Sequence, residues 1–246
     1  LIASLIVVFY GNIVLKDISA FGIYINFSIL SYPLTIFFIL GCINCMNLID
    51  GLDGLASGIS SIYFLTIGII TTIKGSTGLD FVLTFVMLGS TLGFLVHNFY
   101  PASIFMGQSG SMFLGFIVAV IALLGFKNVT MTSLIIPLLI LAIPILDTLF
   151  AIIRRLLKGE NPSKPDKFHI HHQLLNRNFS QRTTVLIIYA VNLLFSFASI
   201  VYVLKDRILG YIIYSILLVM VVLFVAKTNV ILDDEQKDKL FKVKKK

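Results

Sequence analysis

Residues 44–54 read Asn-Cys-Met-Asn-Leu-Ile-Asp-Gly-Leu-Asp-Gly and lie between two long apolar runs, at 34–42 and 55–73. The segment holds two carboxylates three residues apart, Asp50 and Asp53. A carboxylate at the edge of a bilayer is costly, so acids in this setting are candidates for a functional site. The glycines and asparagines beside them let the backbone bend close to a ligand and offer neutral donors and acceptors. The segment therefore predicts a polar site at a membrane surface.

The composition indicates that the whole chain belongs in a membrane, because 58% of its residues are hydrophobic and only 13% are charged. Soluble domains contain about 25% charged residues, which argues against a large soluble helical core. A spanning helix needs about 20 apolar residues. We therefore expect an all-α polytopic membrane protein with about eight transmembrane helices, near residues 1–15, 30–46, 54–73, 80–97, 110–126, 133–153, 183–204 and 208–226. Since residue 1 is not Met, we also expect the natural chain to extend upstream.

The basic residues predict the orientation. If the spans alternate sides, one set of connections holds five of the 19 lysines and arginines and the other set holds 14. The positive-inside rule makes the second set cytoplasmic. That set contains the loop 154–182 and a basic tail at 227–246, which we separate from a transmembrane catalytic domain at 1–226. The net charge of +7 thus indicates topology and affinity for anionic lipid, and not nucleic-acid binding.

This topology brings the polar clusters to one side of the membrane. The two acids, the segment 97–111 and the histidines of the loop 154–182 all fall in cytoplasmic connections, so we expect the active site at the cytoplasmic face. The opposite connections are short, except for 16–28, where we expect a small hairpin. Cys42 and Cys45 form a C-x-x-C within an apolar run, and we interpret them as small buried residues rather than a zinc or redox site.

Several polar residues have more than one interpretation. The turn 107–111, Gly-Gln-Ser-Gly-Ser, suits an N-cap and equally an anion site at a helix N-terminus. Arg154 is either a topology anchor or a ligand. Asp147 is either a hydrogen-bonding partner at a proline kink or part of the site. Three of the chain's four histidines share one loop, which favours phosphate binding, proton transfer or metal ligation at His169, His171 and His172.

Acids, phosphate-binding turns and basic residues at one membrane face suit phosphoryl transfer, in which a metal and positive groups neutralise spreading charge. A membrane ion or solute transporter is the rival class. A transporter should place its binding groups near the midplane, on broken helices within internal repeats. The sequence contains no convincing repeat and its acids cluster at one interface, which favours an enzyme.

Three motifs resemble, in order and spacing, those of the polyprenyl-phosphate N-acetylhexosamine-1-phosphate transferases, of the glycosyltransferase 4 type. They are N-x-x-N-x-x-D-G-x-D-G-L-A at 44–56, Asn98 with F-M-G-x-S-G-S-x-x-L-G at 105–115, and His-Ile-His-His at 169–172. The superfamily includes the enzymes that initiate teichoic acid and O-antigen (lipopolysaccharide) synthesis, and the phospho-MurNAc-pentapeptide transferase of peptidoglycan synthesis. The His-Ile-His-His form is similar to the branch that uses UDP-N-acetylhexosamine, typically UDP-N-acetylglucosamine (UDP-GlcNAc). The peptidoglycan branch, our second choice, usually has three histidines in a row.

The resemblance implies a reaction at the bacterial plasma membrane. N-acetylhexosamine 1-phosphate would pass from a UDP-sugar to undecaprenyl phosphate, with release of UMP and a need for Mg²⁺, for which Mn²⁺ is the alternative. The implied partners are UDP-N-acetylhexosamine, polyprenyl phosphate and the lipid bilayer, with a homodimer left open. The implied catalytic residues are Asp50, Asp53 and His171. The implied substrate-binding residues are Asn47, Asn98, His169, His172 and Arg154, and the implied metal site includes Asn47 and Asp50.

The chain departs from the family pattern at Gln108, where the family has an aspartate that ligates magnesium. Glutamine keeps an oxygen donor but loses the negative charge, and Mg²⁺ is bound chiefly through carboxylates and phosphates. We therefore expect an activity loss on the order of three decades. The family's paired-aspartate motif also belongs upstream of residue 1, together with further spans. We expect this chain alone not to turn over.

Overall fold

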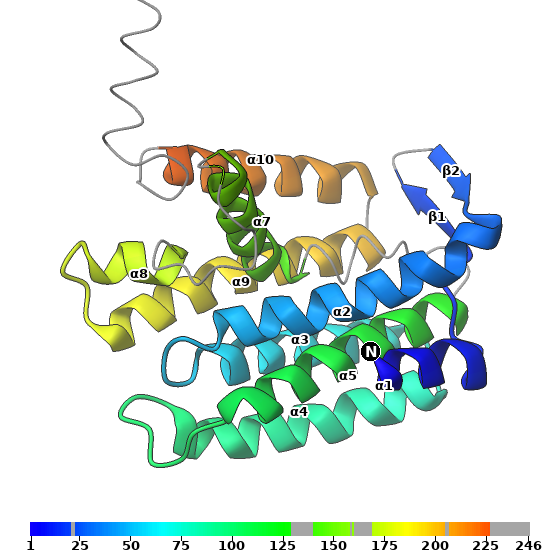
Figure 1. Ribbon diagram of the computed structural model, residues 1–246, viewed down its shortest axis with the longest axis horizontal. Helices are drawn as coiled ribbons and strands as arrows, with labels where there is room; N and C mark the ends of the chain where they lie inside the picture. The colour runs from blue at the N-terminus through cyan, green and yellow to red at the C-terminus, as the bar shows by residue number, and fades with distance from the viewer. Residues whose placement is uncertain (21–22, 129–139, 158, 160–168, 205–206, 227–246) are drawn as a thin grey trace, which may run out of the picture.

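The computed structural model describes residues 1–20, 23–128, 140–157, 159, 169–204 and 207–226 (Figure 1). Helices dominate this part of the chain. The elements in order are α1 (Ile2–Leu5), a π-helical turn (Ile6–Tyr10), β1 (Asp17–Ala20), β2 (Ile23–Asn26), a 3-10 turn (Ser28–Leu30), α2 (Ser31–Ile49), α3 (Leu55–Ile73), α4 (Leu79–Asn98), α5 (Gly107–Asn128), α7 (Ala142–Leu157), α8 (Ile170–Leu175), α9 (Gln181–Leu204) and α10 (Arg207–Ala226).

Five helical stretches are long and apolar enough to cross a membrane, which confirms an all-α multi-pass membrane protein. They are Ser28–Ile49, Leu55–Ile73, Leu79–Asn98, Gly107–Gly125 and Gln181–Val203. A sixth apolar stretch, Ile208–Phe224, is shorter. These six match six of the expected spans, but the count of eight is not confirmed.

The two other expected spans have different outcomes. The span expected at 1–15 is not found as one helix, because helical structure there ends at Tyr10 and the chain turns at Asn12, whose φ is +48°. The span expected at 133–153 lies partly outside the described residues, and its described part contains α7 from Ala142 up to residue 153, whereas α7 continues to Leu157. The basic tail at 227–246 lies wholly outside them, as does part of the loop 154–182.

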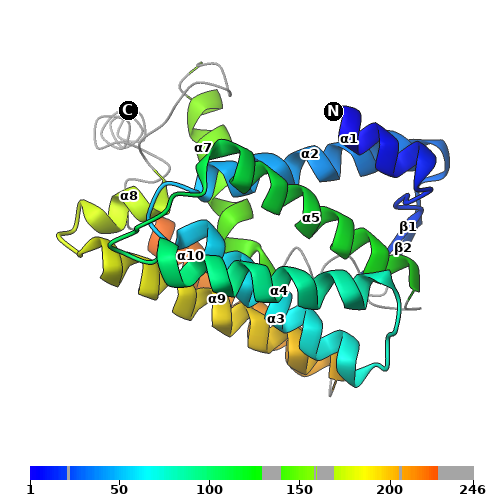
Figure 2. The same cartoon turned by 90° about the horizontal axis from the view of Figure 1, so that it is seen from below.

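The long helices lie side by side and α7 crosses them, as Figures 1 and 2 show from two directions. Helix α2 packs along α5, α3 packs along both α4 and α9, and α9 packs along α10. Gly115 permits the close crossing of α5 over α2, since a Cβ there would stand 2.6 Å from the Cys42 carbonyl oxygen.

Helix α3 is the centre of the bundle, with 78% of its apolar stretch buried against 22% for α4. Tyr63 and Phe64 of α3 are fully buried, and the Tyr63 hydroxyl donates to the Val118 carbonyl oxygen of α5 at 3.2 Å. Helix α4 instead exposes large apolar side chains such as Val96. An apolar outer surface of this kind suits contact with lipid.

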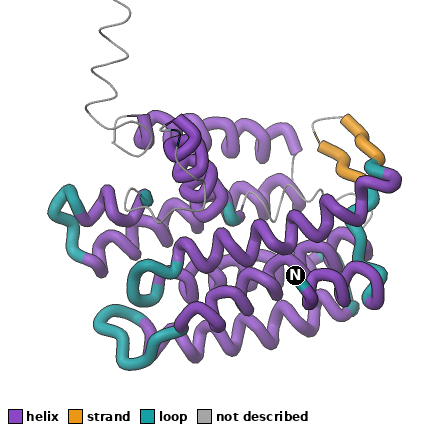
Figure 3. The backbone as a smooth tube through the Cα atoms, viewed as in Figure 1, coloured by secondary structure: helices purple, strands orange, loops and turns teal. Residues whose placement is uncertain are grey.

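The connections divide between the two ends of the bundle. The α2–α3 loop, the α4–α5 loop and α8 lie at one end, where loops are drawn teal at the left of Figure 3. At the other end lies an antiparallel hairpin in which Asp17 of β1 pairs with Asn26 of β2 and Ala20 with Ile23. The hairpin expected at 16–28 is thus confirmed. The helix order gathers the three polar clusters at one end of the bundle, as expected.

Candidate functional site

The α2–α3 loop is built around its two acids. Helix α2 ends at Ile49 and Asp50 is its C-cap, while Gly54, with φ of +78°, immediately precedes α3. The left-handed conformation at Gly54 is one that glycine adopts without steric cost. The chain therefore leaves α2, passes Asp50 and Asp53 and re-enters a helix within five residues, which keeps both carboxyl groups at the end of the bundle.

Asn98, the last residue of α4, connects the α2–α3 loop to the α4–α5 loop through hydrogen bonds. Its Oδ1 accepts hydrogen bonds from the Gly54 N–H (3.1 Å) and the Ser57 hydroxyl (2.8 Å), and its Nδ2 donates to the Ile104 carbonyl oxygen (2.9 Å). The side chain is buried, and a buried amide must find partners for its donors and acceptor. Asn98 thus holds the α2–α3 and α4–α5 loops together.

Asp53 makes a second connection between the same loops. Its Oδ2 accepts a hydrogen bond from the backbone N–H of Ala102 at 3.2 Å. An acid held by a backbone donor keeps a fixed place without the long side chain of a basic partner. Contacts at Asn98 and at Asp53 therefore both join the two loops.

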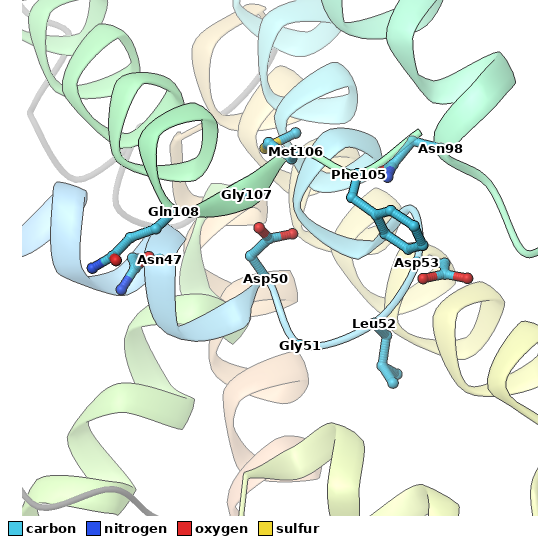
Figure 4. Close-up of a pocket in the computed structure, with 10 residues that line it drawn as sticks. All are labelled: Asn47, Asp50, Gly51, Leu52, Asp53, Asn98, Phe105, Met106, Gly107 and Gln108. Atoms are coloured by element: carbon cyan, nitrogen blue, oxygen red, sulfur yellow. The ribbon is translucent and has the colours of Figure 1, made fainter. Parts of the chain in front are cut away.

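A cavity of about 420 Å³ lies between these loops and the ends of α2 and α5 (Figure 4). In Figure 4, Asp50 lies between the Asn47–Gln108 pair and the group formed by Asp53 and Asn98. The residues that line the cavity are Asn47, Asp50, Gly51, Leu52, Asp53, Asn98, Phe105, Met106, Gly107 and Gln108. The structure thus brings together five of the residues that sequence analysis selected, from four different segments.

The α2–α5 side of the cavity is also hydrogen-bonded. The Ser111 hydroxyl lies 3.1 Å from Asn47 Oδ1 and donates within α5 or to this oxygen. Helix α5 begins at Gly107, so the serines of the 107–111 turn lie inside the helix and the N-cap interpretation is wrong. Gln108 is exposed and faces the cavity from the first turn.

The donor set in the cavity decides whether a metal ion fits. Within the described ranges, no group of three or more His, Cys, Asp or Glu side chains lies close enough together to hold one. The cavity lining offers two partly buried carboxylates, Asp50 and Asp53, and the amide groups of Asn47, Asn98 and Gln108. Mg²⁺ is usually bound through one or two carboxylates plus substrate phosphates. The residues therefore fit a Mg²⁺ ion shared with a phosphate ligand.

Burial affects the acid that would bind this ion. Partial burial raises the pKa of the Asp50 carboxyl above its usual value, because desolvation penalises the charged form. A nearby cation would favour the charged form again. Asp50 therefore suits a site in which a bound cation stabilises the charged form of its carboxyl group.

The three histidines of the loop motif form a cluster at the start of α8. The ring centroids of His171 and His172 are 4.3 Å apart, and the rings of His169 and His171 are parallel to within 2° at 5.7 Å. His171 lies against the α2–α3 loop, since a Cβ built on Gly51 would stand 2.7 Å from its Nε2. The cluster therefore adjoins the cavity loop, although no histidine lines the cavity itself.

His171 is the most distinctive member of this cluster. It is 2% exposed, and its Nε2 has no hydrogen-bond partner. Burial lowers the pKa of His171 to about 4, so the ring is neutral at neutral pH. A buried nitrogen without a partner costs free energy unless a ligand supplies one.

Asp147 of α7 joins this cluster, a role that the sequence left open. Its Oδ2 lies 2.9 Å from Nδ1 of His169, and its Oδ1 accepts a hydrogen bond from the Ile170 N–H at 2.7 Å. The signal in the sequence was an acid within an apolar helix, but its partner is 22 residues away. Only the packing of α7 against the α8 segment reveals the pair.

Other sequence interpretations have mixed outcomes. Arg154 is 1% exposed and is not among the residues that line the cavity, and its assignment as a ligand or an anchor stays a prediction. Cys42 and Cys45 are free, with Cys42 buried and Cys45 partly buried, as expected of small packing residues. The Thr148 side chain hydrogen-bonds Cys45, which ties α7 to α2 beneath the site.

Comparison with known proteins gives consistent findings. A family model described as "Glycosyl transferase family 4" matches residues 1–126. The chain is 45% identical over 173 residues to a probable undecaprenyl-phosphate N-acetylglucosaminyl 1-phosphate transferase of Bacillus subtilis (strain 168). The aligned region covers 70% of this chain and 48% of that protein.

Two further relatives carry similar names. The chain is 30% identical over 192 residues to an undecaprenyl-phosphate alpha-N-acetylglucosaminyl 1-phosphate transferase of Escherichia coli O157:H7, covering 75% of this chain and 52% of that protein. It is 40% identical over 120 residues to a decaprenyl-phosphate N-acetylglucosaminephosphotransferase of Mycolicibacterium smegmatis, covering 44% of this chain and 30% of that protein. The chain thus spans about half, or less, of the length of these relatives.

Proposed function

Because the chain belongs to glycosyl transferase family 4, we propose that it forms the catalytic cavity of a membrane enzyme that transfers N-acetylglucosamine 1-phosphate from UDP-GlcNAc to a polyprenyl phosphate. The names of the relatives combine N-acetylglucosamine phosphate transfer with undecaprenyl or decaprenyl phosphate. The observation that carries the proposal is the polar cavity around Asp50 and Asp53, at one end of an apolar bundle. A water-soluble nucleotide sugar and a lipid-anchored phosphate can meet at such a place.

The proposed chemistry is a displacement at phosphorus. An oxygen of the polyprenyl phosphate attacks the β-phosphorus of UDP-GlcNAc, and the bond from that phosphorus to the bridging oxygen breaks. UMP leaves with the bridging oxygen, and the product is a polyprenyl diphosphate that carries the sugar. The protein need only hold the reactants in line and stabilise charge on the phosphoryl group.

The residues around the cavity divide these tasks. We assign Asp50 and Asp53 to the reacting diphosphate, Asn47 and Asn98 to substrate binding, and His171 to the catalytic set. His171 contributes a neutral ring with an unpartnered nitrogen, which can accept a hydrogen bond or a proton from a ligand group. His169 and His172 complete the cluster beside it, as substrate-binding residues. Arg154 is buried and is not among the cavity-lining residues, so its substrate-binding role stays a prediction from the family resemblance.

Mg²⁺ is the cofactor that this set would hold, through Asn47 and Asp50, with Gln108 next to them in the cavity lining. When bound, the ion would neutralise negative charge on the diphosphate. Gln108 provides an amide oxygen where a carboxylate would bind more strongly. We therefore propose a metal site of low affinity in this chain.

The placement of the cavity favours an enzyme over a transporter. A transporter site should lie near the midplane, whereas this cavity lies where α2 and α4 end and α3 and α5 begin. The distribution of basic residues supports a cytoplasmic position for this end of the bundle, in a bacterial plasma membrane. UDP-sugar would then enter from the cytoplasm.

Equilibrium binding tests the proposal. The purified chain in lipid nanodiscs should bind UDP-GlcNAc saturably, and Mg²⁺ should strengthen the binding. Asp50→Asn should weaken binding when Mg²⁺ is present but not when it is absent, because the acid acts through the cation. Asp80→Asn is the matched control, since Asp80 is buried in the first turn of α4, whereas the cavity lies at the last residue of that helix, Asn98. Ion flux through liposomes without UDP-GlcNAc binding would contradict the proposal.

A further inference from the structure

We propose that Asp147 is a positioning residue that fixes the proton of His169 on Nδ1 and holds the start of α8, so that the histidine cluster keeps its place beside the Asp50–Asp53 loop. The inference rests on the proposed function for its role in transfer. Its geometric part concerns the protein alone and can be tested without substrate.

Both oxygens of the Asp147 carboxylate have a hydrogen-bond partner at the start of α8. Oδ2 lies 2.9 Å from His169 Nδ1, and Oδ1 accepts from the Ile170 N–H at 2.7 Å. Asp147 is 3% exposed and His169 is 5% exposed. A buried carboxylate is strongly unfavourable unless it is paired and hydrogen-bonded. The two donors from the start of α8 meet that requirement.

The contact with the carboxylate determines the tautomer of His169. An ionised carboxylate can only accept hydrogen bonds, so the hydrogen between Oδ2 and Nδ1 belongs to the ring. In the neutral ring, Nε2 then has no hydrogen and is the acceptor. The hydrogen bond at one ring nitrogen thus sets the chemistry of the other, as it does in a Ser-His-Asp triad.

The second contact stabilises a helix that has little stability of its own. Helix α8 has six residues, and its N-cap residue, His169, makes no side-chain capping bond. Isolated helices of this length do not form in water, and their first N–H groups need partners. Asp147 supplies one from α7, in the way that an N-cap acid would.

The position of the start of α8 affects the α2–α3 loop through the stacked rings of His169 and His171. His169 is parallel to His171, and His171 lies against Gly51, the residue after Asp50. Displacement of the start of α8 would therefore move His171 relative to the loop that carries both acids. Asp147 itself does not line the cavity.

Asn at position 147 separates this role from simple packing, because it keeps the size and shape of the side chain. Its amide oxygen can still accept from Ile170, while its NH₂ group can only donate to His169. The donation would move the ring proton from Nδ1 to Nε2. A residue that only filled space would tolerate the change without altering the tautomer.

The test is nitrogen NMR of the full chain with ¹⁵N-labelled histidine in nanodiscs, with the His169 signals assigned through His169→Gln. We expect the Nδ1–H form of His169 in the unmodified chain and the Nε2–H form in Asp147→Asn. Asp80→Asn should leave the signals unchanged. An Nε2–H tautomer in the unmodified chain would overturn the proposal, even if Asp147→Asn failed to fold.

Kinetics provide the second part of the test. The kinetics use a chimera in which this chain replaces the matching part of its Bacillus subtilis relative, supplied with UDP-GlcNAc and polyprenyl phosphate. In this chimera, Asp147→Asn should lower kcat for UMP release by about 100-fold or more and change KM for UDP-GlcNAc much less. Equal kcat values with an unchanged tautomer would reject the role of Asp147. Absence of UDP-GlcNAc binding by the unmodified chain, together with absence of UMP release by the chimera, would instead reject the proposed function. The tautomer measurement would still decide the geometric part.

Discussion

His171 lies so close to Gly51 that a Cβ on this glycine would stand 2.7 Å from Nε2 and 3.1 Å from Cε1 of the imidazole ring. Real Cβ atoms do not approach other atoms so closely, and the ring is buried on its other sides. The two motifs, 120 residues apart in sequence, therefore form one surface only because position 51 has no side chain.

Gly51→Ala should displace His171 and lower the rate of UMP release by about 100-fold in the chimera with the Bacillus subtilis relative, because small displacements of a reacting group have effects of that size. The backbone at Gly51 does not have a positive φ, so steric contact alone should cause the loss. Gly41→Ala in α2 is the control, since a Cβ there would meet nothing within 4 Å. Equal rates for Gly51→Ala and Gly41→Ala would contradict the contact.

Asn98→Asp should destabilise the fold by about 1–3 kcal/mol. The substitution removes the donor to the Ile104 carbonyl oxygen and places a carboxylate oxygen beside it, whereas the acceptor for Gly54 and Ser57 is kept. Chemical unfolding in detergent measures the change. Asn44→Asp is the control, because Asn44 is exposed and bonds only to its own helix at Leu40. Equal stability of the two variants would show that Asn98 does not hold the loops together.

The low pKa of His171 predicts a dependence of stability on pH. Burial lowers this pKa from 6.5 to about 4, so the unfolded chain binds more protons than the folded chain between these values. The free energy of unfolding should therefore fall as the pH drops from 6.5 towards 4, by up to about 3 kcal/mol. Above pH 6.5 this histidine should have no effect.

Thermal unfolding followed between pH 4 and pH 8 would measure this dependence. His171→Gln removes the titrating group and should flatten the curve over the acid half of the range. The same slope in the unmodified chain and in His171→Gln would show that the ring is not held neutral in the folded protein.

Gln108→Asp should raise the Mg²⁺-dependent UMP release of the chimera with the Bacillus subtilis relative, on the order of 1000-fold if several kcal/mol of charge stabilisation are regained. Gln108 lines the cavity with Asn47 and Asp50, so a carboxylate at 108 would share the same ion. Ser109→Asp adds the same charge at the neighbouring exposed position, which is not part of the cavity lining, and should have little effect. Equal rates before and after Gln108→Asp would exclude position 108 from metal binding.

The sequence predicted much of this molecule because a membrane limits the possible structures. Uninterrupted apolar runs such as 55–73 become helices almost at the expected residues, since backbone groups in lipid must be paired within the segment. The spanning helix predicted at 1–15 was wrong, because average hydropathy does not reveal the turn at Gly11 and Asn12. Asp50 and Asp53 were found because a carboxylate is conspicuous beside apolar runs.

The contacts that organise the site could not be found in the same way. Asn98 was expected at a substrate, yet its hydrogen bonds also join two loops, and Asp147 finds its partner on a segment far along the chain. Such pairs depend on how helices pack, which local patterns do not contain. The motif resemblance named the right family, whereas the roles within the site required the coordinates.

The most direct measurement follows the β-phosphate of the donor. A chimera in which this chain replaces the matching part of its Bacillus subtilis relative is placed in nanodiscs that contain undecaprenyl phosphate. It is supplied with Mg²⁺ and UDP-GlcNAc labelled with ³²P at the β-position, and lipid and aqueous products are separated. We predict that the label enters the lipid fraction together with the sugar, that unlabelled UMP is released in equal amount, and that Asp50→Asn abolishes both. Label that remains in the aqueous fraction as UDP, with sugar alone in the lipid, would contradict phosphosugar transfer by this cavity.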